Sequence, residues 1–197
     1  MIYIYHREID RVWYAAAVEN GKVFATAFSL SEREVLRRLL LSLPYDVPFQ
    51  MAKKTSRLST ELLRTLKLIF DGKEVSPSFK IAVGRLSSYS RGVLQCVSLI
   101  PVGYITTYGA IAEAAGGSPR SVGGAVASNP FPLLIPCHRV VRADFSVGGY
   151  GLGENIKQGL LQREDRGYEE ATEVKMNGKT FPLFPVKRLR KAELSKN

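Results

Sequence analysis

The sequence predicts a small α/β unit followed by a mainly helical unit that contains a helix-turn-helix. Three observations lead to this prediction. Two apolar runs rich in strand-forming residues flank Asn20-Gly21, which is a strong hairpin signal. Two amphipathic helical patterns follow before residue 71. Farther along, two short helical patterns meet at Gly116-Gly117, as the helices of a helix-turn-helix do.

The first 80 residues form the predicted N-terminal α/β domain. Residues 1–28 indicate strands, because "VWYAAAV" and "KVFATAF" lie on either side of the turn "ENGK". A helix is expected after Ser31, which together with Glu34 has the spacing of a capping box. A second helix is expected over 57–70. We find no chemical motif in this domain.

Residues 81–89 are a predicted connector, and a helical pattern then runs from about Ser90 to Pro101. Cys96 lies on this pattern among apolar residues. A cysteine in such a setting behaves as a small hydrophobic residue, so we interpret Cys96 as part of the core.

The predicted helix-turn-helix is the most informative local pattern. "TTYGAIAEAAGG" predicts a short helix, and Ser118 and Pro119 start a second one at once. This second helix carries Arg120 near its start and Gly123-Gly124 in its middle. Two glycines destabilise a helix by about 1 kcal/mol each, so their presence needs a reason. One reason is that a partner molecule or a neighbouring helix approaches the backbone closely there. We favour DNA over tight packing against a neighbouring helix.

A glycine-rich loop and a helix over about 154–164 complete the second domain, which we bound at 90–168. A basic C-terminal tail follows over 169–197. Part of this tail predicts a hairpin that turns at Asn177-Gly178. The last stretch, "VKRLRKAELSK", is basic and is expected to be disordered.

The composition points to a cytoplasmic protein with a polyanionic partner. The net charge of +10 favours nucleic acid first and an anionic membrane second. Two cysteines do not make a disulfide framework. The N-terminus does not resemble a signal peptide, and no apolar run reaches the ~20 residues of a membrane-spanning helix.

The stretch "LIPCHRVV" at 134–141 places one of two cysteines beside one of two histidines. On a regular strand, Cys137 and His138 would point to opposite faces. Pro136 favours a break in the strand, and a bend would let the imidazole reach the sulfur directly or through one water. A histidine that takes the thiol proton creates the thiolate, which is the nucleophile.

"IPCHRVV", preceded by "SPRSVGGAVASNPFP", resembles the O6-alkylguanine-DNA alkyltransferase (methylated-DNA–protein-cysteine methyltransferase) family over about 86–168. The resemblance implies an RNase-H-like N-terminal domain and a winged-helix-like catalytic domain. It also implies DNA repair by direct reversal, in which a flipped O6-alkylguanine transfers its alkyl group irreversibly to a cysteine. O4-alkylthymine is a second candidate substrate.

The resemblance assigns five residues to the chemistry. Cys137 would accept the alkyl group, and His138 would act on it through a water as the base. Glu164 would hold the histidine. Asn129 would tie the two halves of the site together. Tyr108 would stand beside the flipped guanine and its phosphate and donate a proton toward the leaving base.

The resemblance also implies how DNA and the base are held. Arg120 would fill the gap left in the duplex. The second helix would lie in the minor groove through Ser121, Gly123, Gly124 and Ala127. The guanine pocket, which includes the 147–153 loop, would be lined by Pro132, Val147, Gly148, Tyr150 and Gly151.

The expected partner is double-stranded DNA containing O6-alkylguanine, bound by a monomer. We expect no cofactor and no structural zinc, because His6 and Cys96 are the only spare ligands of their kinds. Three alternatives remain. An alkylguanine-binding protein without transfer is disfavoured because Cys137 is present. A helix-turn-helix regulator would bind undamaged DNA sequence-specifically, and a thiol hydrolase using Cys137 and His138 would turn over.

Overall fold

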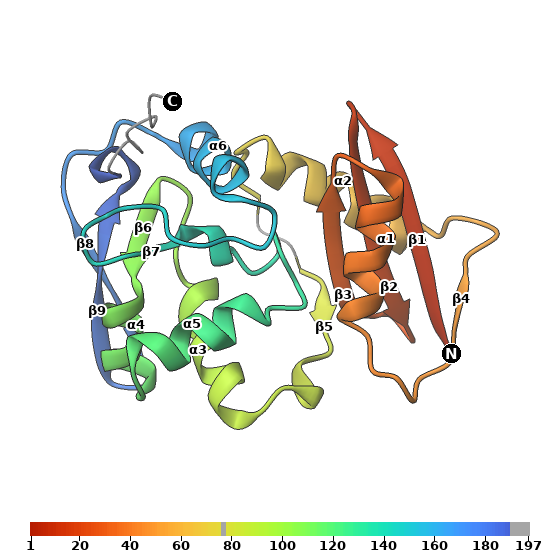
Figure 1. Ribbon diagram of the computed structural model, residues 1–197, viewed down its shortest axis with the longest axis horizontal. Helices are drawn as coiled ribbons and strands as arrows, with labels where there is room; N and C mark the ends of the chain where they lie inside the picture. Colours follow the sequence, from red (N-terminus) through yellow and green to blue (C-terminus); the bar gives the residue numbers. More distant parts are fainter. Residues whose placement is uncertain (76–77, 190–197) are drawn as a thin grey trace, which may run out of the picture. The chain divides into compact units, whose positions relative to one another are not determined.

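The structure is a computed structural model that describes residues 1–75 and 78–189. Its contacts divide the chain into two compact units, each with its own sheet (Figure 1). The first unit consists of Met1–Ser87 together with Ser128–Ile135. The second begins at Ser88, runs to Ala127, and resumes at Pro136.

The first unit contains a five-stranded sheet in the order β4-β1-β2-β3-β5. Its strands are β1 (Ile2–Ile9), β2 (Val12–Glu19), β3 (Lys22–Ser29), β4 (Phe49–Met51) and β5 (Lys80–Ile81). β1, β2 and β3 form an antiparallel meander, and the short β4 and β5 add parallel partners at its edges. The predicted turn between β2 and β3 is confirmed, since Asn20 and Gly21 have φ angles of 48° and 73°.

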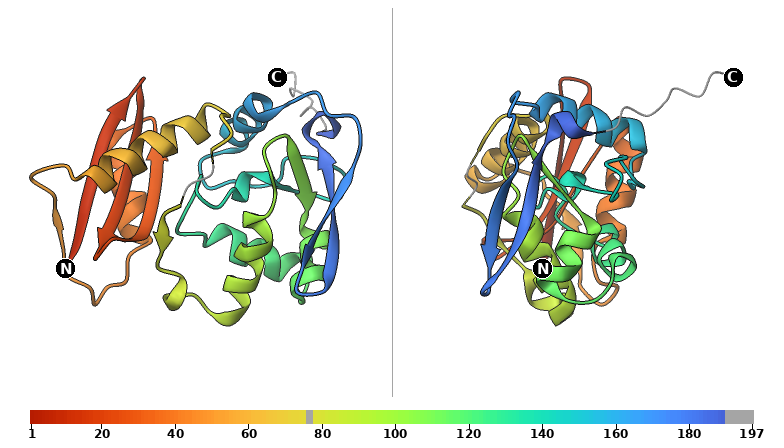
Figure 2. Two further views of the ribbon diagram at one scale, coloured as in Figure 1. Left: turned by 180° about the vertical axis from the view of Figure 1, so that it is seen from behind. Right: turned by 90° about the vertical axis from the view of Figure 1, so that its left-hand side faces the viewer.

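Helices α1 (Glu32–Leu41) and α2 (Arg57–Phe70) cover the two faces of this sheet (Figure 2). Val35 and Leu39 of α1 pack on the alanines that β2 and β3 present to one face. On the other face, Phe70 of α2 contacts the rings of Tyr14 and Phe28. Cover on both faces explains why β2 is apolar at nearly every position.

The capping box predicted at Ser31 is wrong. Ser31 is the N-cap of α1, but its side chain makes no capping hydrogen bond. Glu34 instead accepts hydrogen bonds from Arg37 and forms an ion pair with Arg38. Arg37 binds both carboxylate oxygens and Arg38 adds a second guanidinium, and together these ion pairs hold the carboxylate more strongly than one backbone N–H would.

Among its described residues, the second unit contains four helices and a four-stranded sheet in the order β7-β6-β9-β8. Its helices are α3 (Ser88–Ser98), α4 (Tyr108–Ala115), α5 (Pro119–Ala127) and α6 (Glu154–Glu164). Its strands are β6 (Tyr104–Thr107), β7 (Val140–Val141), β8 (Thr172–Met176) and β9 (Lys179–Pro185). Cys96 on α3 is fully buried, as predicted, with its sulfur 3.5 Å from that of Met176.

Helices α4 and α5 form the predicted helix-turn-helix. Thr107 caps α4 by accepting a hydrogen bond from the Ala110 amide at 3.1 Å. Ser118 and Ser121 cap α5 reciprocally, each side chain accepting from the other's backbone N–H. Gly117 between the helices has a φ of 90°, and an added Cβ would lie 2.6 Å from the Tyr89 hydroxyl, so the turn requires glycine.

The hairpin predicted at Asn177-Gly178 is present, and these two residues have φ angles of 49° and 82°. Its second strand, β9, pairs antiparallel with β6, so the hairpin extends the sheet of the second unit (Figure 2). The basic end beyond residue 189 lies outside the described residues. No helix in the described ranges has both the length and the apolar character needed to cross a membrane.

Candidate active site

Cys137 begins a short 3₁₀ turn, Cys137–Arg139, directly after Pro136. The Arg139 amide donates to the Pro136 carbonyl at 2.9 Å and closes the turn. The predicted break in the strand is therefore present, and β7 begins only at Val140. Cys137 is 6% exposed and His138 is fully buried.

A buried network of three charged or polar side chains follows Cys137. His138 Nε2 lies 3.0 Å from Glu164 Oε1. Arg139 donates to the same carboxylate twice, through Nε and an Nη, at 2.8 Å each. Arg139 also donates to the Ile100 carbonyl. Glu164 is 1% exposed, so it serves two partners in a water-poor environment.

Burial lowers the pKa of His138 from its ordinary 6.5, and this effect outweighs the opposing influence of Glu164. The imidazole is therefore neutral at pH 7 and donates its Nε2 proton to the carboxylate. Its Nδ1 is buried without a hydrogen-bond partner among the described residues. In this tautomer Nδ1 carries a lone pair that can accept a proton.

Glu164 stays ionised in this setting. Burial would raise the pKa of Glu164, but the charges and hydrogen bonds of His138 and Arg139 together lower it from 4.5 to about 2. Because His138 is neutral at pH 7, the Arg139 guanidinium is the group that holds the carboxylate charged there.

Lys157 and Tyr108 bring a cation and a phenol to the same region of the second unit. Lys157 is 1% exposed, and its Nζ donates to the Val140 carbonyl at 2.7 Å. The same Nζ lies 5.9 Å from the centre of the Tyr108 ring. Burial lowers the pKa of Lys157 to about 8, against an opposing attraction to Cys137. Burial, and then the charge of Cys137, raise the pKa of Tyr108, so the phenol keeps its proton.

The glycine-rich loop packs onto Tyr108. A Cβ added at Gly148 would lie 3.6 Å from the Tyr108 ring and 3.4 Å from Arg142. Val147 is buried, Tyr150 is half-buried and Gly151 is exposed. Among the described residues, no three His, Cys, Asp or Glu side chains are grouped as metal ligands would be.

One face of α5 is open to solvent. Arg120, Gly124 and Ala127 are exposed, and Gly123 is half-buried. A Cβ added at Gly123 or Gly124 would meet no atom within 4 Å. Packing against a neighbouring helix therefore does not explain these glycines. Ser121 is exposed too, but its hydroxyl is engaged by Ser118 and Tyr89.

Asn129 and Pro132 belong to the first unit. The Asn129 side chain accepts from the Phe131 amide and donates to the Ile135 carbonyl, each at 3.0 Å. The Pro132 carbonyl accepts from the Thr26 hydroxyl of β3 at 2.9 Å. These bonds fix the chain segment that ends immediately before Pro136 and Cys137.

Comparison with known proteins agrees with this arrangement. A family model described as "6-O-methylguanine DNA methyltransferase, DNA binding domain" matches residues 81–166. A methylated-DNA–protein-cysteine methyltransferase of Methanothermobacter thermautotrophicus is 48% identical over 107 residues, which are 53% of this chain and 60% of that protein. One from Archaeoglobus fulgidus is 40% identical over 115 residues, 55% of this chain and 77% of that protein.

This chain belongs to the methylated-DNA–protein-cysteine methyltransferase family. Its fold agrees as well. The crystal structure of an O6-methylguanine-DNA methyltransferase from Pyrococcus kodakaraensis superposes with a TM-score of 0.65 at 25% identity, covering 83% of this chain and 99% of that one. In sequence, the chain spans 60% of the length of the Methanothermobacter methyltransferase.

Two residues of this methyltransferase-family site were missed in the sequence, Arg139 and Lys157. A signal for Lys157 exists, because it shares helical spacing with the buried Leu160, Leu161 and Glu164 of α6. A charged residue on the core-facing stripe of a helix points to a buried partner. For Arg139, the only signal in the sequence is its position directly after His138.

Proposed function

We propose that this chain repairs O6-alkylguanine in DNA by transferring the alkyl group irreversibly to Cys137. The observation that carries the proposal is the buried Cys137 beside a neutral His138 that is held by Glu164 and Arg139, in a chain of this family. A non-transferring alkylguanine-binding protein would have no use for this arrangement. A thiol hydrolase would use it but would turn over.

The proposed reaction is a displacement at carbon. The Cys137 proton passes through one water to His138 Nδ1, and the thiolate attacks the alkyl carbon. A sulfur–carbon bond forms while the bond from that carbon to guanine O6 breaks. The leaving base takes a proton from the Tyr108 hydroxyl, which solvent later replaces. The products are guanine and a thioether on Cys137, and since no group present reverses a thioether, each molecule reacts once.

We expect Lys157 to stabilise the thiolate as a buried cation. Lys157→Met should lower the transfer rate from O6-benzylguanine at pH 7, because the positive charge near Cys137 is lost. The rate should recover as pH rises and more thiolate forms. The transfer rate, measured from samples quenched at successive times over a range of pH, tests this expectation. Lys175→Met, which removes the same charge on exposed β8, is the control. If the pH–rate profiles of the two variants coincide, Lys157 does not stabilise the thiolate.

Duplex DNA is the proposed partner, bound through α5 in the minor groove with the target base flipped out. Arg120 would fill the vacated stack. The open face formed by Gly123, Gly124 and Ala127 supports a close approach of the DNA backbone. Ser121 would reach DNA mainly through its backbone, since its hydroxyl caps the helix.

Gly124→Ala separates stability from DNA binding. Alanine should stabilise the fold by about 1 kcal/mol, because it favours a helix and meets no atom. The same methyl group should weaken binding to lesion-containing duplex severalfold by holding the DNA away. Urea unfolding and fluorescence anisotropy give the two quantities. Gly92→Ala on α3, equally uncrowded, should match the stability gain and leave affinity unchanged; equal affinities for the two variants would contradict the approach.

The base pocket is proposed to be lined by the five residues Pro132, Val147, Gly148, Tyr150 and Gly151. Asn129 would keep the chain before Cys137 in place, a role that its bond to the Ile135 carbonyl supports. O4-alkylthymine remains a candidate second substrate.

We further propose an RNase-H-like N-terminal domain over 1–80, a connector over 81–89, a winged-helix-like catalytic domain over 90–168, and a C-terminal segment over 169–197. The antiparallel hairpin β8–β9 supports the winged-helix description, because β9 packs against α4 of the helix-turn-helix even though the hairpin follows the bound at residue 168. The protein would act as a monomer in the cytoplasm.

Restoration of guanine tests the function. The protein is titrated against excess duplex carrying one O6-methylguanine, and the guanine formed is quantified by chromatography of the digested DNA. The proposal predicts a plateau at one guanine per protein molecule. Continued formation indicates turnover by a hydrolase, and none at all indicates a binding protein.

A further inference from the structure

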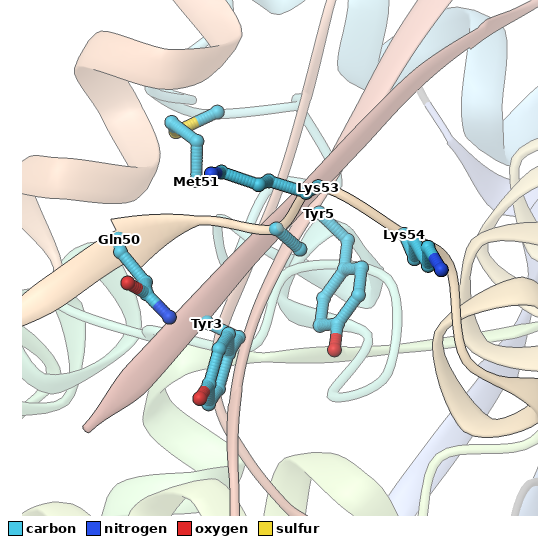
Figure 3. A pocket seen from close by; sticks show the side chains of 7 residues that line it. Tyr3, Tyr5, Gln50, Met51, Lys53 and Lys54 are labelled. Carbon is cyan, nitrogen blue, oxygen red and sulfur yellow. The ribbon is translucent and has the colours of Figure 1, made fainter.

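A hollow on the first unit lies at the edge of its sheet, where β4 pairs with β1 (Figure 3). Its volume is about 320 Å³, within the range of small-ligand sites. Seven residues line it: Tyr3, Tyr5, Gln50, Met51, Ala52, Lys53 and Lys54. No step of the proposed repair reaction uses any of them.

Tyr3 and Tyr5 present two aromatic rings on one face of β1 (Figure 3). Their neighbours Ile2 and Ile4 point the other way into the core and are 0% and 1% exposed. Tyr3, by contrast, is 41% exposed. Neither phenol oxygen hydrogen-bonds to another residue in the described ranges. Tyr5 is half-buried, so each ring leaves part of its surface open to solvent.

The hollow is also basic. Lys53 and Lys54 are exposed and follow β4, and Arg57 begins α2 close by in the chain. No acidic residue stands between Asp46 and Glu61. Neither lysine forms an ion pair with any residue that the structure describes. The two ammonium groups therefore remain available for anions, and phosphate is the anion that suits them.

Aromatic rings on a strand together with lysines are the means by which sheets hold unpaired nucleotides, with bases on the rings and phosphates at the cations. Tyr3 and Tyr5 are two residues apart, or about 6.7 Å along the strand. Neighbouring bases within a duplex strand are stacked about 3.4 Å apart, so a duplex cannot place one base on each ring. An unstacked single strand can.

We propose that this hollow binds a short stretch of single-stranded DNA, with bases against Tyr3 and Tyr5 and phosphates at Lys53 and Lys54. This proposed strand site, formed by Tyr3, Tyr5, Lys53 and Lys54, belongs to the first unit, whereas Cys137 and α5 belong to the second. The choice of DNA over RNA rests on the proposed function. The existence of the strand site does not rest on the proposed function, because its residues and its binding assay are independent of alkyl transfer.

Two double variants test the site by anisotropy with a short fluorescein-labelled oligothymidylate. Tyr3→Thr/Tyr5→Thr keeps strand-forming residues and removes both rings, and it should weaken binding by about tenfold or more. Lys53→Gln/Lys54→Gln should weaken binding and flatten its salt dependence. Lys22→Gln/Lys73→Gln, with the same charge change elsewhere on the first unit, should do neither. Transfer from free O6-benzylguanine should be unchanged in all of them.

Photocrosslinking shows directly where the single-stranded oligonucleotide binds. An oligonucleotide with 5-iodouracil should crosslink to the tryptic peptide of residues 1–7, as read by mass spectrometry. Crosslinks confined to the second unit overturn the proposal, as do unaltered affinities of the tyrosine variant. If the tyrosine variant loses as much affinity for duplex as for single-stranded DNA, the preference for a single strand is overturned. If the parent protein binds oligouridylate more tightly than oligothymidylate, the assignment to DNA is overturned. A parent protein that fails to transfer alkyl groups but crosslinks at residues 1–7 would refute only the repair function.

Discussion

Cys137→Ser is expected to abolish alkyl transfer while leaving affinity for lesion-containing duplex nearly unchanged. A serine hydroxyl is almost entirely protonated at neutral pH and is a far weaker nucleophile than a thiolate. The side chains are similar in size, so the buried turn Cys137–Arg139 should keep its shape. Transfer is measured as guanine restored in the duplex, and affinity by anisotropy on the same DNA.

The second cysteine provides the matched control. Cys96 lies fully buried on α3 against Met176, remote in role from the chemistry. Cys96→Ala should lower stability modestly and preserve transfer with its one-to-one stoichiometry. Guanine restoration by the Cys137→Ser protein would show that another group accepts the alkyl chain.

Glu164→Gln should cost about 3–5 kcal/mol of unfolding free energy, because it leaves the Arg139 cation buried without its carboxylate. The glutamine amide would also turn an N–H group toward His138 or Arg139, which are themselves donors at this carboxylate. Urea denaturation measures the loss. The double variant Arg139→Met/Glu164→Leu should recover much of that stability, since apolar pairs can replace a buried ion pair. It should not recover the transfer rate, because His138 would still lack its acceptor.

Acid should remove the same stabilisation in the parent protein. The pKa of Glu164 is lowered to about 2 in the folded chain, against 4.5 ordinarily, so the unfolded chain binds the extra proton between these values. The contribution is complete above pH 4.5 and is lost as pH falls toward 2, in total about 3 kcal/mol. The double variant should lose less stability over this window. A Glu164→Gln protein within 1 kcal/mol of the parent would contradict the buried network.

The nucleophile could be found from the sequence because it rests on local signals. Cysteine and histidine are each rare in this chain, and Pro136 indicates a bend at their junction. The glycine turns at residues 20–21, 116–117 and 177–178 follow from backbone conformations that few other residues adopt. These features depend on residues that are neighbours in the chain.

Features that depend on distant residues were not predicted. The role of Arg139 arises from a carboxylate 25 positions away, and the hairpin β8–β9 gains its place by pairing with β6. Glu164 was assigned only through the family resemblance. At Ser31, a local rule failed because Glu34 had stronger partners in Arg37 and Arg38. Competition of this kind is visible only once side chains are placed.

Intact-protein mass spectrometry after mixing with excess O6-methylguanine duplex shows directly whether Cys137 accepts the alkyl group. We expect a single added methyl group per molecule, mapped to Cys137 by peptide fragmentation and stable to long incubation. An unchanged protein mass, or a methyl group on any other residue, would contradict it.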